Sequence, residues 1–189
     1  MRHRFTASYM YELPFGKGKA LLGGSSGALQ QVVGGWQVAG ITTVSSGNWF
    51  TPTDSDGNFA NSDGFEGQLP NVVADPNHSS HCKPGTFFNT CAFVDPPLGS
   101  FGDAGRNSVL GPGFQIWDFS VFKTFRVSER TRLEFRSEFF NFPNHTNFLL
   151  SKSGPQQGNN STILGSSQFG TLTAARSPRQ IQFALKLSF

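Results

Sequence analysis

The C-terminal segment alternates strictly between large apolar side chains and small or polar ones. Because successive side chains of a β-strand point to opposite faces, one face of this segment is wholly apolar. That face carries Ile181, Phe183, Leu185, Leu187 and the terminal Phe189. A transmembrane barrel strand contacts lipid with such a face and has aromatic residues at the membrane interface. The segment therefore predicts a lipid-facing strand of a β-barrel.

Five segments carry strand patterns, and we expect strands near residues 4–12, 36–46, 115–127, 131–142 and 179–189. The fourth is the most informative, because Leu133, Phe135 and Phe139 share one face. Its other face carries charges of alternating sign, namely Arg132, Glu134, Arg136 and Glu138. A soluble sheet would expose this ladder to solvent, whereas a wide barrel would turn it toward a water-filled lumen. In the third segment, Phe122 and Lys123 break the alternation.

The composition is typical of an all-β chain, with 21 Phe, 22 Gly and only 14% charged residues. The net charge is +3, and the basic residues of the fourth strand alternate with acidic ones. A nucleic-acid surface would show basic residues without matching acids, so we expect no nucleic-acid partner. Residues 1–4 lead into a strand pattern without the apolar region of a signal peptide. If the chain lies in a membrane, we therefore expect it to be the C-terminal part of a longer precursor.

The connections between the predicted strands alternate in length. The third and fourth strands are joined by a short turn, whereas residues 47–114 and 144–178 form long loops. Outer-membrane barrels have short turns on the periplasmic side and long loops outside the cell. Residues 14–35 form a longer periplasmic connection, in which residues 28–33 suit a helical turn. Because barrels begin at about eight strands, five strands predict an unclosed, antiparallel, up-and-down barrel fragment.

The two cysteines, Cys82 and Cys91, lie in the first long loop. The residues between them allow the chain to fold back, so we expect a disulfide in an oxidising compartment. His78 and His81 precede the cysteines without a standard zinc-ligand spacing. The segment that begins at Asp54 resembles a calcium loop but has Phe where that loop needs its Gly and its final Glu. We expect no metal and no cofactor.

An enzymatic role is not expected. Glu134 and Glu138 share a strand face, but arginines flank them and would keep both carboxylates ionised. The chain has no nucleophile elbow, phosphate loop or dinucleotide fingerprint. His145 has no nucleophile beside it and suits a structural position at a strand end.

Several motifs resemble the C-terminal barrel end of TonB-dependent outer-membrane receptors, especially the Oar-like group with a carboxypeptidase-regulatory-like domain. They are His3-Arg4-Phe5 with Glu12-Leu13-Pro14-Phe15-Gly16-Lys17-Gly18, Gly35-Trp36-Gln37-Val38-Ala39-Gly40 with Ser46-Gly47, Phe101-Gly102-Asp103-Ala104-Gly105-Arg106-Asn107-Ser108 with Gly111-Pro112-Gly113, Phe135-Arg136-Ser137-Glu138-Phe139-Phe140-Asn141-Phe142-Pro143-Asn144-His145, and the terminal Phe189. Together they span nearly the whole chain.

The resemblance implies the last five strands of a barrel of about twenty-two, filled by a plug in the full protein. It implies outer-membrane lipid and the barrel assembly machinery as partners, the latter through the terminal strand. It also implies uptake of a siderophore, glycan or peptide, energised by TonB through an N-terminal part that this sequence lacks. The expected location is the outer membrane of a Gram-negative bacterium. No substrate-binding residue is implied, because those contacts come from the plug and from variable loops.

Two alternatives remain open. A passive or adhesin-like outer-membrane barrel would share the strand chemistry and differ only upstream. A soluble β-sandwich that binds glycans would pack Phe135, Phe139, Phe183 and Leu187 against a second sheet, whereas a barrel would turn them outward.

Overall fold

The computed structural model describes residues 2–54, 68–78, 82–149 and 161–189, which form two compact units. The strand unit comprises Arg4–Val44, Gln115–His145 and Ser177–Phe189. The insert unit comprises Met1–His3, Ser45–Phe114 and Thr146–Arg176. Within the described ranges, no helix has the length and apolar character needed to cross a membrane.

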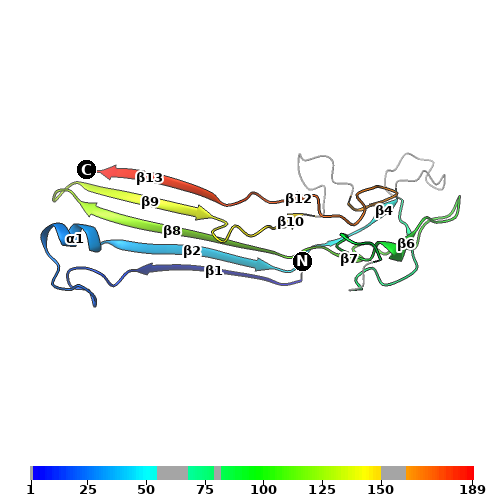
Figure 1. The fold of residues 1–189 in the computed structure, drawn as a ribbon, viewed down its shortest axis with the longest axis horizontal. Helices are drawn as coiled ribbons and strands as arrows, with labels where there is room; N and C mark the ends of the chain where they lie inside the picture. Colours follow the sequence, from blue (N-terminus) through cyan, green and yellow to red (C-terminus); the bar gives the residue numbers. More distant parts are fainter. Residues whose placement is uncertain (1, 55–67, 79–81, 150–160) are drawn as a thin grey trace. The chain divides into compact units, whose positions relative to one another are not determined.

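The strand unit is built on one five-stranded antiparallel sheet (Figure 1). Its strands, in spatial order, are β1 (Arg4–Glu12), β2 (Trp36–Ser45), β8 (Phe114–Arg126), β9 (Arg132–Phe140) and β13 (Gln180–Ser188). Each is 9 to 13 residues long, which reaches the roughly 9–11 residues that a tilted strand needs to cross a bilayer. The sheet is unclosed, with β1 and β13 at its edges, so the predicted all-β barrel fragment is confirmed.

The register of the sheet sorts its side chains into two faces. Phe119, Phe139 and Ile181 are aligned across three strands, and Lys123, Phe135 and Leu185 form a second such row. We call this side the apolar face; in β8, β9 and β13 it consists of Phe119, Val121, Lys123, Phe125, Leu133, Phe135, Ser137, Phe139, Ile181, Phe183, Leu185 and Leu187. The opposite side, the polar face, consists of Ser120, Phe122, Thr124, Arg126, Arg132, Glu134, Arg136, Glu138, Gln182, Ala184, Lys186 and Ser188.

No second sheet belongs to the strand unit in the part of the chain that the structure describes, because the other four sheets lie in the insert unit. Phe135 stacks on Phe183 of the neighbouring strand, with ring centroids 6.2 Å apart. Phe183 and Leu187 remain exposed. A β-sandwich would have covered these residues, so the soluble alternative is not supported by the fold.

Aromatic residues gather toward both ends of the apolar face. At one end, Phe119, Phe139 and Phe142 form a cluster with centroid distances of 5.5 to 6.4 Å. Toward the other end, Trp36 and Phe125 both lie beside the Lys123 ammonium. Outer-membrane barrels carry aromatic girdles at both membrane interfaces, on either side of an apolar band. The two end groups suit such girdles, and Phe135 and Phe183, which stack in the rows between them, belong to the apolar band.

The end of the sheet at which β2 begins holds the β1–β2 and β8–β9 connections (Figure 1). Helix α1 (Gly27–Val33) leads into β2 and agrees with the predicted helical turn. Gly35 then adopts φ +74°, and a Cβ on it would lie 2.7 Å from the Thr124 carbonyl oxygen. Only glycine allows both this backbone conformation and this close approach of β2 to β8.

At the other end, the turn after β9 is organised by asparagines. The Asn141 side chain donates to the carbonyl of His145 and accepts from its backbone N–H, at 2.9 and 3.1 Å. The Asn144 side chain accepts from the Arg179 backbone N–H at 2.9 Å, which ties the turn to the segment before β13. Both asparagines have positive φ, a conformation that Asn tolerates better than most residues. His145 is thus part of a structural turn.

The insert unit is made from the two long connections, and the elements in its described part are short. Its helical turn is η2 (Thr90–Ala92), and its strands pair as β3 (Trp49–Phe50) with β7 (Val109–Leu110), β4 (Thr53–Asp54) with β11 (Ile163–Leu164), β5 (Asn71–Val72) with β6 (Phe93–Val94), and β10 (Phe148–Leu149) with β12 (Ala174–Ala175). Phe88 is the centre of its core, with the rings of Phe50, Phe93 and Phe169 at 5.2 to 6.1 Å. The residues expected only as long loops therefore form a packed unit.

Candidate functional site

The charge ladder of β9 lies on the polar face, as its alternation indicated. The Arg136 guanidinium is placed between two carboxylates, 3.1 Å from Glu134 and 3.6 Å from Glu138. It also lies over the Phe122 ring, 4.9 Å from the centroid. Phe122 is directly opposite Arg136 in the register, so its departure from the alternation of β8 supplies a cation–π contact. These groups are partly exposed, and their pairing orders the polar face more than it stabilises the fold.

Arg132 closes the ladder at the end of the sheet that carries the short turn. It is exposed and lies opposite Arg126 of β8 and Ser188 of β13. Like charges directly opposite one another on neighbouring strands are unfavourable. Since both side chains reach solvent, the repulsion is screened.

The residues predicted as the assembly signal all lie on β13 or directly after it. Ile181, Leu185 and Leu187 are aligned with Phe139, Phe135 and Leu133 of β9, and Phe183 is aligned with Ser137. All four side chains of the signal within β13 are exposed, and Phe189 follows the last strand residue. Every residue of β13 is exposed, because its far edge has no neighbouring strand. Such an edge is a template for another strand.

Lys123 is the other exception to the alternation of β8, and the structure gives it a specific environment. It lies on the apolar face, yet only 1% of its surface is exposed. Its ammonium donates to the Val32 carbonyl at 2.9 Å and to the Gly34 carbonyl, and it lies 5.0 Å from the Trp36 ring centroid. The sequence pattern identified Lys123 as an irregularity. The two carbonyl groups that it binds lie before β2, and only the order of the strands in the sheet shows that they are close to Lys123.

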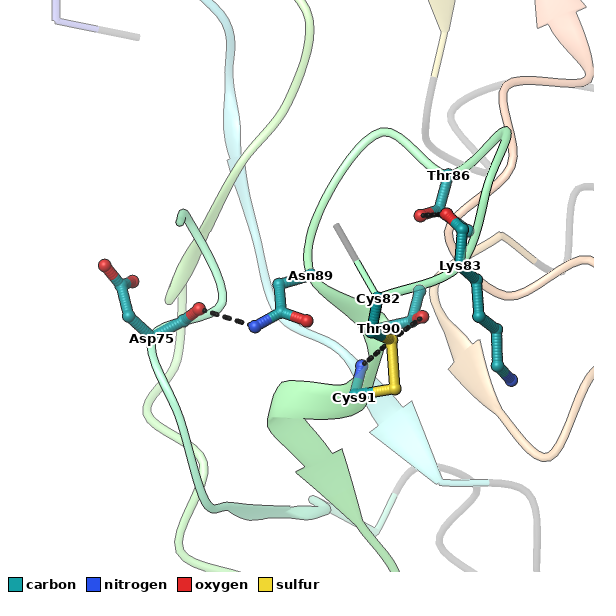
Figure 2. Close-up of a disulfide and its surroundings, with 7 residues drawn as sticks. All are labelled: Asp75, Cys82, Lys83, Thr86, Asn89, Thr90 and Cys91. Atoms are coloured by element: carbon teal, nitrogen blue, oxygen red, sulfur yellow. Dashed lines mark hydrogen bonds between the residues drawn. A yellow bond between two sulfur atoms is a disulfide. The ribbon is translucent and has the colours of Figure 1, made fainter. Parts of the chain in front are cut away.

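Cys82 and Cys91 form a disulfide in the insert unit, with Cα atoms 6.0 Å apart (Figure 2). The Cys91 backbone N–H lies 3.1 Å from the Cys82 sulfur, and the neighbouring Thr90 is buried. The loop that the bond closes contains Phe88, the centre of the aromatic core. The disulfide therefore constrains the segment that positions this core residue.

We expect Cys82→Ser/Cys91→Ser to lower the free energy of unfolding of the insert unit by about 2–3 kcal/mol. Without the bond, the unfolded chain has more conformational entropy, and a closed loop of this length corresponds to a loss of stability of that size. Limited proteolysis of the two forms would measure the difference. Alkylation followed by mass spectrometry checks the bond itself. The protein should take up two labels only after reduction, and labelling without a reductant would contradict the prediction.

The remaining polar candidates that lie within the described ranges do not form a metal site. His81 lies outside the described residues, as do the positions after Asp54 in the segment that resembles a calcium loop. Within the ranges that the structure describes, no three His, Cys, Asp or Glu side chains are grouped so that they could hold a metal ion. His78 belongs to a turn in which its backbone N–H donates to Asp75.

Comparison with known proteins agrees with the geometry of the sheet. The outer membrane beta barrel domain family matches residues 1–182. Neither curated proteins nor solved structures give a match. The matched range leaves out only residues 183–189 and covers parts of both units. Together with strands of membrane-crossing length and one apolar face, this match places the protein in the outer membrane. The chain belongs to the outer membrane beta barrel domain family.

Proposed function

We propose that the chain supplies the C-terminal strands of the barrel of a TonB-dependent outer-membrane transporter, which takes up a siderophore, a glycan or a peptide. The observation that carries this proposal is the combination of an unclosed sheet with a packed insert unit. Five strands are too few for closure, so further strands must complete the wall. The insert unit, formed by the long connections, offers an ordered surface on which a solute can be captured.

The two faces of the sheet then have distinct roles. The apolar face contacts lipid, and the polar face lines the lumen with Arg132, Glu134, Arg136 and Glu138. Arg136 pairs with both Glu134 and Glu138, so both carboxylates are engaged in ion pairs on this face. We therefore propose a role in binding and transport and not in catalysis.

The terminal strand has an additional role in assembly. Its exposed apolar residues and Phe189 would be recognised by the barrel assembly machinery before the sheet closes. Pairing of β13 with the first strand of the complete barrel would remove the open edge. In this orientation the short turn between β8 and β9 faces the periplasm, and the long connections lie on the extracellular side, where an oxidised disulfide is stable.

The test uses the full-length protein that contains this chain. We expect its reading frame to encode a plug domain, and we expect the protein to bind the purified periplasmic domain of TonB. Reconstituted in a planar lipid bilayer, it should show no steady ion conductance, because a plug closes the lumen. A constitutively open pore that does not bind TonB would contradict the proposal and would favour the passive barrel instead.

A further inference from the structure

The only charged side chain on the apolar face of the described part of β8, β9 and β13 is Lys123. A lysine exposed to lipid is unfavourable by about 2–4 kcal/mol at the bilayer centre, and by much less near an interface. Lys123 lies three positions before the end of β8, and its side chain is covered by neighbours. Its position therefore suits the membrane interface, provided that something on the protein covers the ammonium.

The C-terminal end of α1 covers the Lys123 ammonium. The Lys123 ammonium donates to the Val32 and Gly34 carbonyls, where the helix dipole favours a positive charge. The Trp36 indole N–H also donates to the Val32 carbonyl, at 2.9 Å. Two side chains from different strands thus bind one helix end. This arrangement fixes α1 at the end of the apolar face, beside the aromatic residues Trp36 and Phe125.

The same helix presents apolar side chains that the protein leaves uncovered. Leu29 is 54% exposed and Val32 is 65% exposed, and both lie on one side of the helix because they are three residues apart. Leu21 and Leu22, in the turn before the helix, are also exposed. The opposite side of α1 is polar and engaged, since the Gln30 side chain accepts from the Lys17 backbone and the Gln31 amide donates to the Arg126 carbonyl.

We infer that α1 is a membrane-interface anchor, in which Lys123 holds the helix at the edge of the lipid-facing surface and Leu29 and Val32 enter the adjoining lipid leaflet. The occupant is lipid because the helix continues the apolar face, which contacts lipid in an outer-membrane barrel. The inference rests on the proposed lipid contact of that face. It does not depend on TonB or on the transported solute. A short helix would bind lipid weakly alone, but here the barrel already places it at the interface.

Site-directed spin labels on the full-length protein in lipid vesicles test this inference. Labels at Leu29→Cys and Val32→Cys should be more accessible to oxygen, which dissolves in lipid, than to a water-soluble nickel complex. A label at Gln31→Cys should show the reverse, because residue 31 lies about 200° around the helix from residue 29. Leu185→Cys on β13 serves as a reference for the lipid-facing sheet. The native cysteines form a disulfide and stay unlabelled without a reductant.

The label at Leu185→Cys shows whether a negative result concerns the helix anchor alone or also the lipid contact of the sheet. If Leu185→Cys reports lipid while the labels at residues 29 and 32 report water, the anchor is wrong and the lipid contact of the sheet stands. If Leu185→Cys also reports water, the proposed lipid contact fails as well.

The role of Lys123 has its own test. Lys123→Met should increase the mobility of a label at residue 29 several-fold in the spectrum and leave the label at residue 185 unchanged, because methionine cannot bind the carbonyls. Lys186→Met, on the polar face of β13, is the matched control and should alter neither label. An unchanged label at residue 29 in Lys123→Met would overturn the assigned role of the lysine.

Discussion

Leu185→Arg is expected to prevent normal assembly of the barrel in the membrane. Leu185 lies on the apolar face of β13, with 70% of its surface exposed. An arginine that faces lipid makes the free energy of folding into the membrane less favourable, by up to about 2–4 kcal/mol at the bilayer centre. The assembled fraction can be measured by the shift in electrophoretic mobility between unheated and heated samples of outer membranes.

Two variants on the same strand show whether the effect depends on the face. Gln182→Arg introduces the same side chain on the polar face, directly opposite Glu138, and should assemble normally. Lys186→Ala removes a charge from the polar face and should also be tolerated, because an exposed substitution of this kind changes stability by about 0.5 kcal/mol or less. If Leu185→Arg and Gln182→Arg assembled equally well, the face assignment would be wrong.

The strands were predictable because their patterns are local. The predicted bounds of the five long strands differ from the observed ones by no more than two residues at either end. Alternation in β9 and β13 placed the charge ladder and the apolar side chains on opposite faces, and the register agrees. A period of two is set by the geometry of the strand itself, so it can be read without knowledge of the neighbouring strands.

The position of Lys123 could not be explained from the sequence, because its contacts are not local in the chain. Its partners Val32 and Gly34 are separated from it by about ninety residues, and their backbone carbonyls carry no sequence signal. They come together only because β2 pairs with β8, although the long insertion separates these strands in the chain. The irregular residue was visible in the pattern, and only the strand order provides the reason for it.

The packing of the insert unit could not be predicted either, because it too depends on contacts between distant segments. Its strands are two residues long, which is too short for any periodic pattern. Its aromatic core joins Phe50, Phe88 and Phe93 from the first insertion to Phe169 from the second. The sequence signal that was present is the abundance of Phe in segments otherwise rich in Gly and Asn, since exposed loops rarely need so many large apolar side chains.

Phe88→Ala is expected to unfold the insert unit locally while the sheet remains assembled. The Phe88 side chain is 2% exposed and makes edge-to-face contacts with Phe50 and Phe169, with centroids 5.5 and 5.2 Å apart. Removing a buried Phe side chain typically lowers the free energy of unfolding by about 3–5 kcal/mol, because the cavity closes only partly. We expect rapid protease cleavage within residues 45–114, together with an unchanged electrophoretic shift of the barrel.

Phe101→Ala is the matched control, because it makes the same substitution in the same unit at a side chain that is 74% exposed. It should leave the protease pattern unchanged, since little buried contact is lost. Equal resistance of Phe88→Ala and Phe101→Ala would mean that the aromatic core does not stabilise the unit. A loss of barrel assembly in Phe88→Ala would show that the unit folds together with the sheet. The aromatic core lies wholly within the insert unit, so we expect the sheet of the strand unit to assemble without it.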